Sequence, residues 1–135
     1  MNTLIGIRKW FIVTLVIWIL LGISWKAFAG EITEAQAIKT IMGEARGEPY
    51  KGQVAVAEVL RRHGNTIGFY GYTARFKASK REIETARKAW MESTKSNYSN
   101  GANHFEGDCF KRPRWSEEMK VVAHIGKQTF FKEAV

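Results

Sequence analysis

The sequence is poor in cysteine and proline and, over its first thirty residues, has no acidic side chain. One cysteine, Cys109, excludes an intramolecular disulfide framework and a cysteine-based zinc cage. Two prolines among 135 residues, with 25% charged residues, argue against a collagen-like or disordered chain. No acid precedes Glu31, whereas Arg8, Lys9 and Lys26 are basic. The amino end is therefore a basic segment that differs from the rest of the chain.

This amino end has the features of an export segment. Arg8 and Lys9 precede an uncharged, mostly apolar stretch over residues 10–25, and Ala27-Phe28-Ala29 offers a small-x-small cleavage site. Residues 1–29 are therefore predicted to be a signal peptide, or an uncleaved anchor that holds the protein at a membrane through residues 10–25. In both cases the folded part is exported, and the product is secreted, periplasmic or attached to the cell envelope.

Residues 30–135 are enough for one compact core and too few for two. A capping box over 33–36 starts a helix that we expect to end near Arg46. There, Gly47 favours a left-handed exit and Pro49 prevents continuation. The next segment, roughly 51–63, is apolar over most of its circumference, which predicts a central buried helix that ends at Gly64.

The remaining elements are expected to be shorter. A second capping box, over 79–82, predicts a helix that fades near Thr94, and the glycines and aromatics of 64–76 predict a loop with short strands at 72–76. Residues 96–115 should be an ordered loop with extended segments. A last helix over 116–123, closed by Gly126, precedes a terminal strand over 127–132. The sum is a single α+β domain, mainly helical with a few short strands.

Glu44 has the surroundings that best suit acid–base chemistry. At 100° per residue it lies about 110° from the centre of the apolar stripe, on the rim of the buried face and near the carboxyl end of its helix. Partial burial and the negative end of the helix dipole both oppose ionisation. A carboxyl that stays protonated near neutral pH is what a glycosidase general acid requires. An ion pair with Arg46 or Arg62 on the surface is the alternative.

The stretch 44–57, EARGEPYKGQVAVA, resembles the opening signature of the spore cortex-lytic enzyme family, the SleB-type cell-wall hydrolases. Later segments resemble that family in the same order: Gly101-Ala102-Asn103-His104-Phe105, Pro113-Arg114-Trp115, and Ile125-Gly126 followed by Thr129-Phe130-Phe131. The match spans most of residues 34–131. It implies a lysozyme-like, mainly helical domain that cleaves the glycan strands of peptidoglycan as a lytic transglycosylase.

The resemblance also assigns a role to Glu44, since the family's catalytic acid/base stands at this position. Glu44 would protonate the glycosidic oxygen that leaves N-acetylmuramic acid. The resulting carboxylate would then deprotonate the muramoyl O6 hydroxyl, and a 1,6-anhydro ring would close. This internal attack explains how one carboxylate suffices, whereas hydrolysis by water usually uses two. Hydrolysis in which Glu48 or Asp108 activates the water is the competing mechanism.

Six further residues are candidates for substrate contact: Glu48, Tyr50, Gln53, His104, Phe105 and Trp115. Glycan sites combine flat aromatic faces with amide hydrogen bonds, which favours the aromatic residues and Gln53 in this role. Glu48 has an alternative role, in which it holds its loop by binding backbone amides or Arg46. The three histidines lack the spacing of metal ligands, so neither a metal nor another cofactor is expected.

Two departures from the family pattern motivate a function of a different class. Gln128 stands where the family commonly has histidine, and Arg61 stands where asparagine is usual. The alternative is therefore a non-catalytic peptidoglycan-binding or envelope-interaction module with the same fold. The net charge of +8 attracts polyanions in general. For an exported chain, anionic wall polymers are sufficient partners, so peptidoglycan rather than nucleic acid is the expected one.

Overall fold

The computed structural model describes residues 31–108 and 111–134 of the chain. The predicted export segment, 1–29, and Cys109 lie outside the described residues. From Ile32 onward the chain forms one compact unit. Within the described ranges, no helix is both long enough and apolar enough to cross a bilayer.

The three α-helices of this unit begin and end close to the predicted positions. They are α2 (Glu34–Ala45), α3 (Tyr50–His63) and α4 (Lys80–Glu92), and both predicted capping boxes are formed. Gly64 ends α3 in the left-handed conformation, with a φ of 70°. The left-handed exit predicted for Gly47 is wrong, because Arg46 caps α2 in the right-handed conformation and Gly47 has no positive φ. Pro49, which has no N–H to satisfy, stands at the N-cap of α3.

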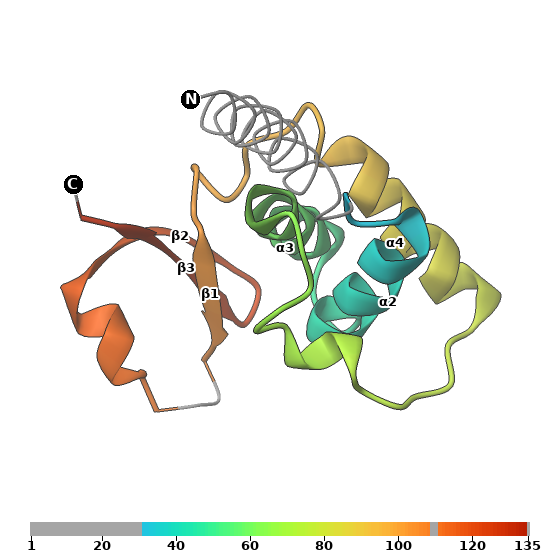
Figure 1. The fold of residues 1–135 in the computed structure, drawn as a ribbon, viewed down its shortest axis with the longest axis horizontal. Helices are drawn as coiled ribbons and strands as arrows, with labels where there is room; N and C mark the ends of the chain where they lie inside the picture. Colours follow the sequence, from blue (N-terminus) through green and yellow to red (C-terminus); the bar gives the residue numbers. More distant parts are fainter. Residues whose placement is uncertain (1–30, 109–110, 135) are drawn as a thin grey trace, which may run out of the picture. The chain divides into compact units, whose positions relative to one another are not determined.

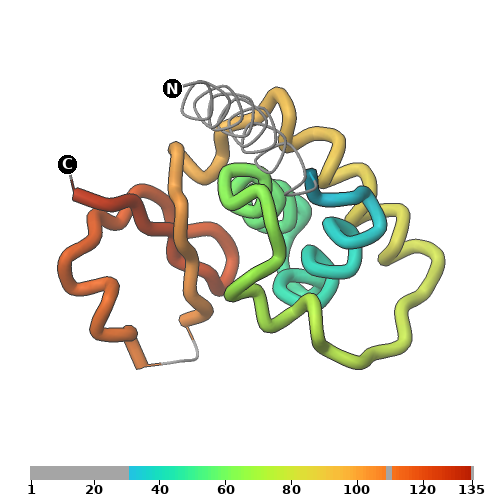
Figure 2. Tube along the Cα trace, in the orientation of Figure 1, coloured from blue at the N-terminus to red at the C-terminus, as the bar shows by residue number. Residues whose placement is uncertain are grey.

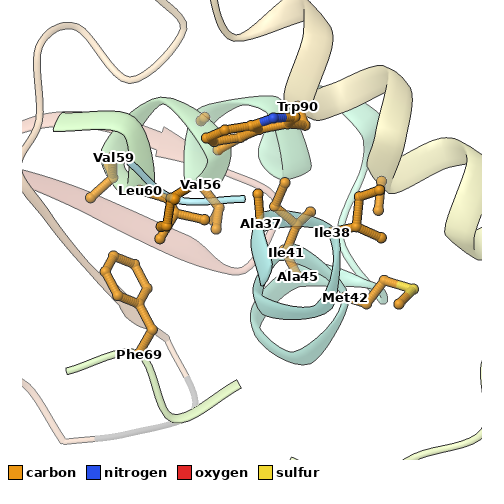
Figure 3. Packing of buried hydrophobic residues seen from close by; sticks show 14 of the residues in the cluster. Ala37, Ile38, Ile41, Met42, Ala45, Val56, Val59, Leu60, Phe69 and Trp90 are labelled. Atoms are coloured by element: carbon orange, nitrogen blue, oxygen red, sulfur yellow. The ribbon is translucent and has the colours of Figure 1, made fainter. Parts of the chain in front are cut away.

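Helix α3 is the centre of the fold, as its sequence predicts. All residues from Gly52 to Leu60 are buried. Figure 1 shows α3 between the other two helices on one side and the β-sheet on the other. In Figure 3, Trp90 of α4 lies over the contact between α2 and α3, while Phe69, from the segment after α3, lies below Val59. The central helix thus joins the helical layer to the sheet.

The sheet has three antiparallel strands in the order β1-β3-β2, with β1 at His104–Gly107, β2 at Met119–Ile125 and β3 at Gln128–Glu133. The central strand β3 sends Phe130, which is fully buried, into the core. Strand β1 confirms that the predicted loop over 96–115 carries an extended segment, and β3 confirms the terminal strand predicted over 127–132. Together with the helices, these strands confirm the mainly helical α+β fold.

The helix predicted over 116–123 is wrong. A short 3-10 helix, η2 (Arg114–Glu118), is followed directly by strand β2. A register shift between Val121 and Ala123 interrupts the alternation of β2, so both Val122 and Ala123 are partly buried against the core. The bulge therefore places apolar residues at a spacing that resembles one face of a helix.

The short strands predicted at 72–76 are also absent. The segment instead contains a 3-10 helix, η1 (Tyr70–Tyr72), which packs on the end of α2. Gly71 of η1 lies directly against Gly43 of α2, and a Cβ atom on either residue would overlap the other's backbone. Figure 2 shows the chain after α3 turning beneath this end of α2. Two glycines thus let a loop approach the helix that carries Glu44.

Candidate active site

A cavity of about 530 Å³ opens between the segment that follows α3 and the sheet. Its lining includes five of the seven predicted site residues: Glu44, Glu48, His104, Phe105 and Trp115. They come from the end of α2, the turn after it, β1 and η2. Residues up to 71 positions apart in sequence therefore meet around one space, with Glu44 among them.

Glu44 is half-buried in the last turn of α2, and its Oε1 accepts a 2.6 Å hydrogen bond from the backbone N–H of Gly71. Burial raises the pKa of Glu44, the Gly71 hydrogen bond lowers it, and the negative charge of Glu106 raises it again, with a net increase. Burial is one of the two causes that the sequence predicts. The carboxyl group therefore keeps its proton to a higher pH than an ordinary glutamate does.

The same hydrogen bond distinguishes the two oxygens of the Glu44 carboxyl. A backbone N–H can only donate, so Oε1 must act as the acceptor. In the neutral carboxyl group this arrangement favours the proton on Oε2. Oε2 is therefore the oxygen that can give a proton to a bound molecule and later accept one.

The turn between β2 and β3 holds the corner between α2 and α3. Oε2 of Glu48 accepts a 2.8 Å hydrogen bond from the backbone N–H of Lys127, and Nε2 of Gln128 donates to the Glu44 carbonyl oxygen at 3.1 Å. Gly126 lies so close to Glu48 that a side chain there would overlap the carboxylate. The contact with Lys127 supports the alternative in which Glu48 binds backbone amides. Gln128, one of the two family departures, holds the backbone of Glu44.

The sheet side of the cavity is a wall of stacked rings. The His104 ring lies 5.2 Å from Trp115, which in turn meets Phe131 edge-on at 5.5 Å. Trp115 remains 42% exposed. Burial lowers the pKa of His104, and the neighbouring His63 lowers it further. Because His104 is therefore neutral near pH 7, this wall offers flat, uncharged surfaces.

Tyr50 and Gln53 do not line this cavity. The Tyr50 hydroxyl donates a 2.8 Å hydrogen bond to Glu92 at the end of α4, and burial, followed by this bond, raises the pKa of Tyr50 to about 12. Gln53 is 7% exposed and donates to the Glu48 carbonyl oxygen at 3.2 Å. Their positions give no support to the predicted contact with substrate, because each side chain is engaged within the domain.

Several residues of the cavity were not predicted from the sequence. Ile67, Phe69 and Tyr70 line it from the segment after α3, and Glu106 lines it from β1. The signal for the first group is the set of glycines and aromatics over 64–76, which predicts a loop with short strands but does not by itself indicate a site. Asp108, a predicted second carboxylate, lies outside the cavity lining and accepts a hydrogen bond from Thr129 instead. Glu106 is the carboxylate that shares the cavity with Glu44 and Glu48.

A search for metal-binding side chains gives no candidate within residues 31–108 and 111–134. No group of three or more His, Cys, Asp or Glu side chains there is arranged to hold a metal ion. The cavity lining itself contains carboxyl, imidazole, carboxamide and ammonium groups beside aromatic side chains.

Comparison with known proteins identifies the fold. No protein-family model and no curated protein matches the sequence. Among solved structures, the catalytic domain of the Bacillus cereus SleB protein matches with a TM-score of 0.60 and 24% identity, over 73% of this chain and 89% of that one. The catalytic domain of the germination-specific lytic transglycosylase SleB from Bacillus anthracis matches with a TM-score of 0.54 and 26% identity, over 73% and 93%. The resemblance predicted from the sequence is thus confirmed: the chain has the SleB catalytic-domain fold.

Proposed function

We propose that this domain is a peptidoglycan-cleaving enzyme, a lytic transglycosylase in which Glu44 is the catalytic acid and base. The observation that carries the proposal is the state of Glu44 itself. Its carboxyl is half-buried in a cavity, holds a single backbone hydrogen bond through Oε1, and has a raised pKa. The similarity to SleB, a lytic transglycosylase in Bacillus anthracis, supports glycan strands as the substrate.

In the proposed reaction Glu44 donates one proton to the glycosidic oxygen and later accepts one from the muramoyl O6 hydroxyl. Oε2 protonates the oxygen of the glycosidic bond, so that the N-acetylglucosamine leaves with its hydroxyl restored while positive charge develops on the muramoyl ring. The Glu44 carboxylate then removes the proton of the muramoyl O6 hydroxyl, whose oxygen closes the 1,6-anhydro ring. No water is consumed, and Glu44 regains its proton. The bond from Gly71 to Oε1 keeps the second oxygen available for both transfers.

The rest of the cavity suits this substrate. Flat neutral rings at His104 and Trp115 provide surfaces against which sugar rings can pack. Phe105 contacts Phe69 and Phe130, which supports a role in shaping the cavity from beneath. Glu48 and Gln128 hold the backbone around Glu44 in place.

Product analysis tests the proposal. The purified protein should release fragments with 1,6-anhydromuramoyl ends from peptidoglycan, as measured by mass spectrometry. Glu44→Gln should lower the rate by about 10²–10⁴-fold, the usual contribution of a general acid–base group, with an unchanged circular dichroism spectrum. Glu84→Gln, an exposed carboxylate on α4, is the matched control and should keep full activity. Reducing muramoyl ends would indicate hydrolysis instead, for which Glu106 is placed to assist.

The second candidate is a non-catalytic peptidoglycan-binding module, motivated by the departures at Gln128 and Arg61. In this fold Gln128 contacts the Glu44 backbone, and Arg61 donates to Ser93 and to the Trp90 carbonyl oxygen. These contacts concern the scaffold, which favours the enzyme. Sedimentation with peptidoglycan without any cleavage would favour the binding module.

We also infer export, with the wall as the partner. The predicted signal peptide or anchor supports this inference. The net charge of +8 is also consistent with binding to anionic wall polymers, and it does not by itself indicate nucleic acid. Expression of the full chain followed by fractionation of medium, envelope and cytoplasm tests it. A protein found in the cytoplasm alone would contradict it.

A further inference from the structure

Two large apolar side chains are exposed at the mouth of the cavity. Ile67 is 80% exposed and Tyr70 is 87% exposed, and both line the cavity that contains Glu44. A single exposed apolar residue is ordinary on a protein surface. These two lie three positions apart on one short segment. Their location at the cavity mouth requires a separate explanation.

The segment that carries them is firmly held. Phe69, between them, is 8% exposed, and its ring contacts those of His63 at 5.1 Å and Phe105 at 6.0 Å. The backbone N–H of Ile67 donates to Asn65 Oδ1 at 2.9 Å. The outward position of Tyr70 therefore does not come from a loose loop, since the chain on its amino side is anchored in the core.

Tyr70 is also fixed relative to the reacting carboxyl. The next residue, Gly71, donates its N–H to Glu44 Oε1 at 2.6 Å and packs against Gly43 without a side chain between them. Tyr70 is thus one residue away from the hydrogen-bond donor of Glu44. A molecule that rests on the Tyr70 ring would occupy the cavity that Glu44 also lines.

We propose that Tyr70, with Ile67 beside it, is a sugar-binding platform on the helix side of the cavity, which complements Trp115 on the sheet side. This inference rests on the proposed function. A glycan strand that crosses Glu44 would place one sugar against Trp115 and another against Tyr70. Pyranose rings have apolar C–H faces, which gain from burial against an aromatic ring and an adjacent aliphatic side chain.

The arrangement has a consequence for substrate choice. Because the two platforms stand on different elements, β1 with η2 on one side and η1 on the other, the site needs sugars on both sides of the scissile bond. The binding energy of the two platforms is available to promote cleavage only when a sugar occupies each of them. We expect short fragments that reach only one platform to be poor substrates.

Tyr70→Ala in the full chain tests the platform, because removal of an 87% exposed side chain leaves the core intact. The peptidoglycan concentration that gives half-maximal rate should rise about 3- to 10-fold, the value of one lost ring contact, with the maximal rate unchanged. Tyr70→Phe, which keeps the ring, should stay within about twofold of the wild type. Met91→Ala removes a 62% exposed apolar side chain outside the cavity and is the matched control.

The outcomes separate this inference from the proposed function. A wild-type protein that neither cleaves nor sediments with peptidoglycan overturns both. A wild-type protein that cleaves, with Tyr70→Ala unchanged in half-maximal concentration, overturns the platform alone. A lower maximal rate without a change in half-maximal concentration would mean that Tyr70 acts only through Gly71 and Glu44, and this also overturns it. Self-association of the wild type that is lost in Tyr70→Ala would assign the exposed pair to a dimer contact instead.

Discussion

Glu44 and Glu58 stand on neighbouring helices, and the protein surrounds them in opposite ways. Glu58 on α3 is only 2% exposed, and burial by itself would raise its pKa. Hydrogen bonds from Ser96, Tyr98 and Ser99 outweigh burial and hold the pKa of Glu58 below its ordinary value. The pKa of Glu44 is raised, because the hydrogen bond from Gly71 does not offset burial and the charge of Glu106 opposes ionisation further. The two carboxyls therefore differ in how far hydrogen-bond donors compensate for burial.

Glu58 is a structural carboxylate, whereas Glu44 is the carboxyl to which the proposed function assigns catalysis. Glu58 holds the segment over 96–99, and Arg62 binds Ser99 Oγ and the Ala102 carbonyl oxygen nearby. This segment leads directly into β1 and its cavity residue His104. An ionised Glu58 therefore positions one wall of the site from behind. Glu44 has few internal partners, which leaves it available to a substrate.

The largest effect on stability should come from Glu58→Gln. The amide N–H groups of the new glutamine would face the donors of Ser96, Tyr98 and Ser99, which now bind the carboxylate. We therefore expect the free energy of unfolding at pH 7 to fall by about 3 kcal/mol. Urea denaturation measures it, with the exposed Glu84→Gln as control. Because the folded pKa of Glu58 is lowered, its contribution is present above the unfolded pKa and is lost as the pH falls through the folded one. A loss below about 1 kcal/mol would mean that Glu58 is not a structural carboxylate.

A substitution at Gly71 should damage both stability and catalysis. A Cβ atom would lie 2.6 Å from the Glu44 backbone nitrogen, so η1 must move away from α2, at a cost of about 1–3 kcal/mol. The bond to Glu44 Oε1 would weaken, and since this bond lowers the pKa of Glu44, the pKa should rise further in Gly71→Ala. Thermal unfolding and the pH dependence of cleavage measure these two effects.

Gly43→Ala approaches the same contact from the helix side and should shift the pH dependence in the same direction. Gly47→Ala is the matched control, because nothing lies within 4 Å of its added Cβ atom and its φ is not positive. Equal pH profiles for Gly71→Ala and Gly47→Ala, at normal folding, would show that the Gly71 bond does not control Glu44.

Both carboxylates also show what the sequence can and cannot reveal. The starts of α2 and α4 were predictable because capping boxes are local. The place of Glu44 on the rim of the buried face follows from α2 alone, whereas its catalytic role comes from the family resemblance and stays a prediction. Glu58 lies within an apolar helix, but its hydrogen-bond partners lie 38 to 41 positions further along the chain. No local pattern reveals such a contact.

The errors in secondary structure have the same origin. Strand β2 was mistaken for a helix because a bulge opposite β3 changed the spacing of its apolar residues. Short strands were predicted at 72–76 because the sequence gives no sign of η1, whose conformation is set by the contact between Gly71 and Gly43, 28 positions away in sequence. In each case a distant element determined the outcome.

Glu44→Gln should have a smaller effect on stability, of opposite sign to that of Glu58→Gln. The raised folded pKa means that the contribution of Glu44 is full below the unfolded pKa and is lost as the pH rises through the folded one. The variant should therefore be more stable than the wild type at pH 7.5, with little difference at pH 4. Thermal unfolding at both pH values measures this. A variant equally destabilised at both would contradict a carboxyl that resists ionisation.

The smallest effect should come from Glu106→Gln, which changes only the charge opposite Glu44. The negative charge of Glu106 raises the pKa of Glu44, so its removal should lower that pKa. Since the proposed reaction begins with a protonated Glu44, the rate should fall at a lower pH in Glu106→Gln than in the wild type. Asp108→Asn, a carboxylate outside the cavity lining, should leave the profile unchanged. If Glu106→Gln abolishes cleavage at every pH, then Glu106 takes part in the chemistry, and hydrolysis by two carboxylates replaces the one-carboxyl mechanism.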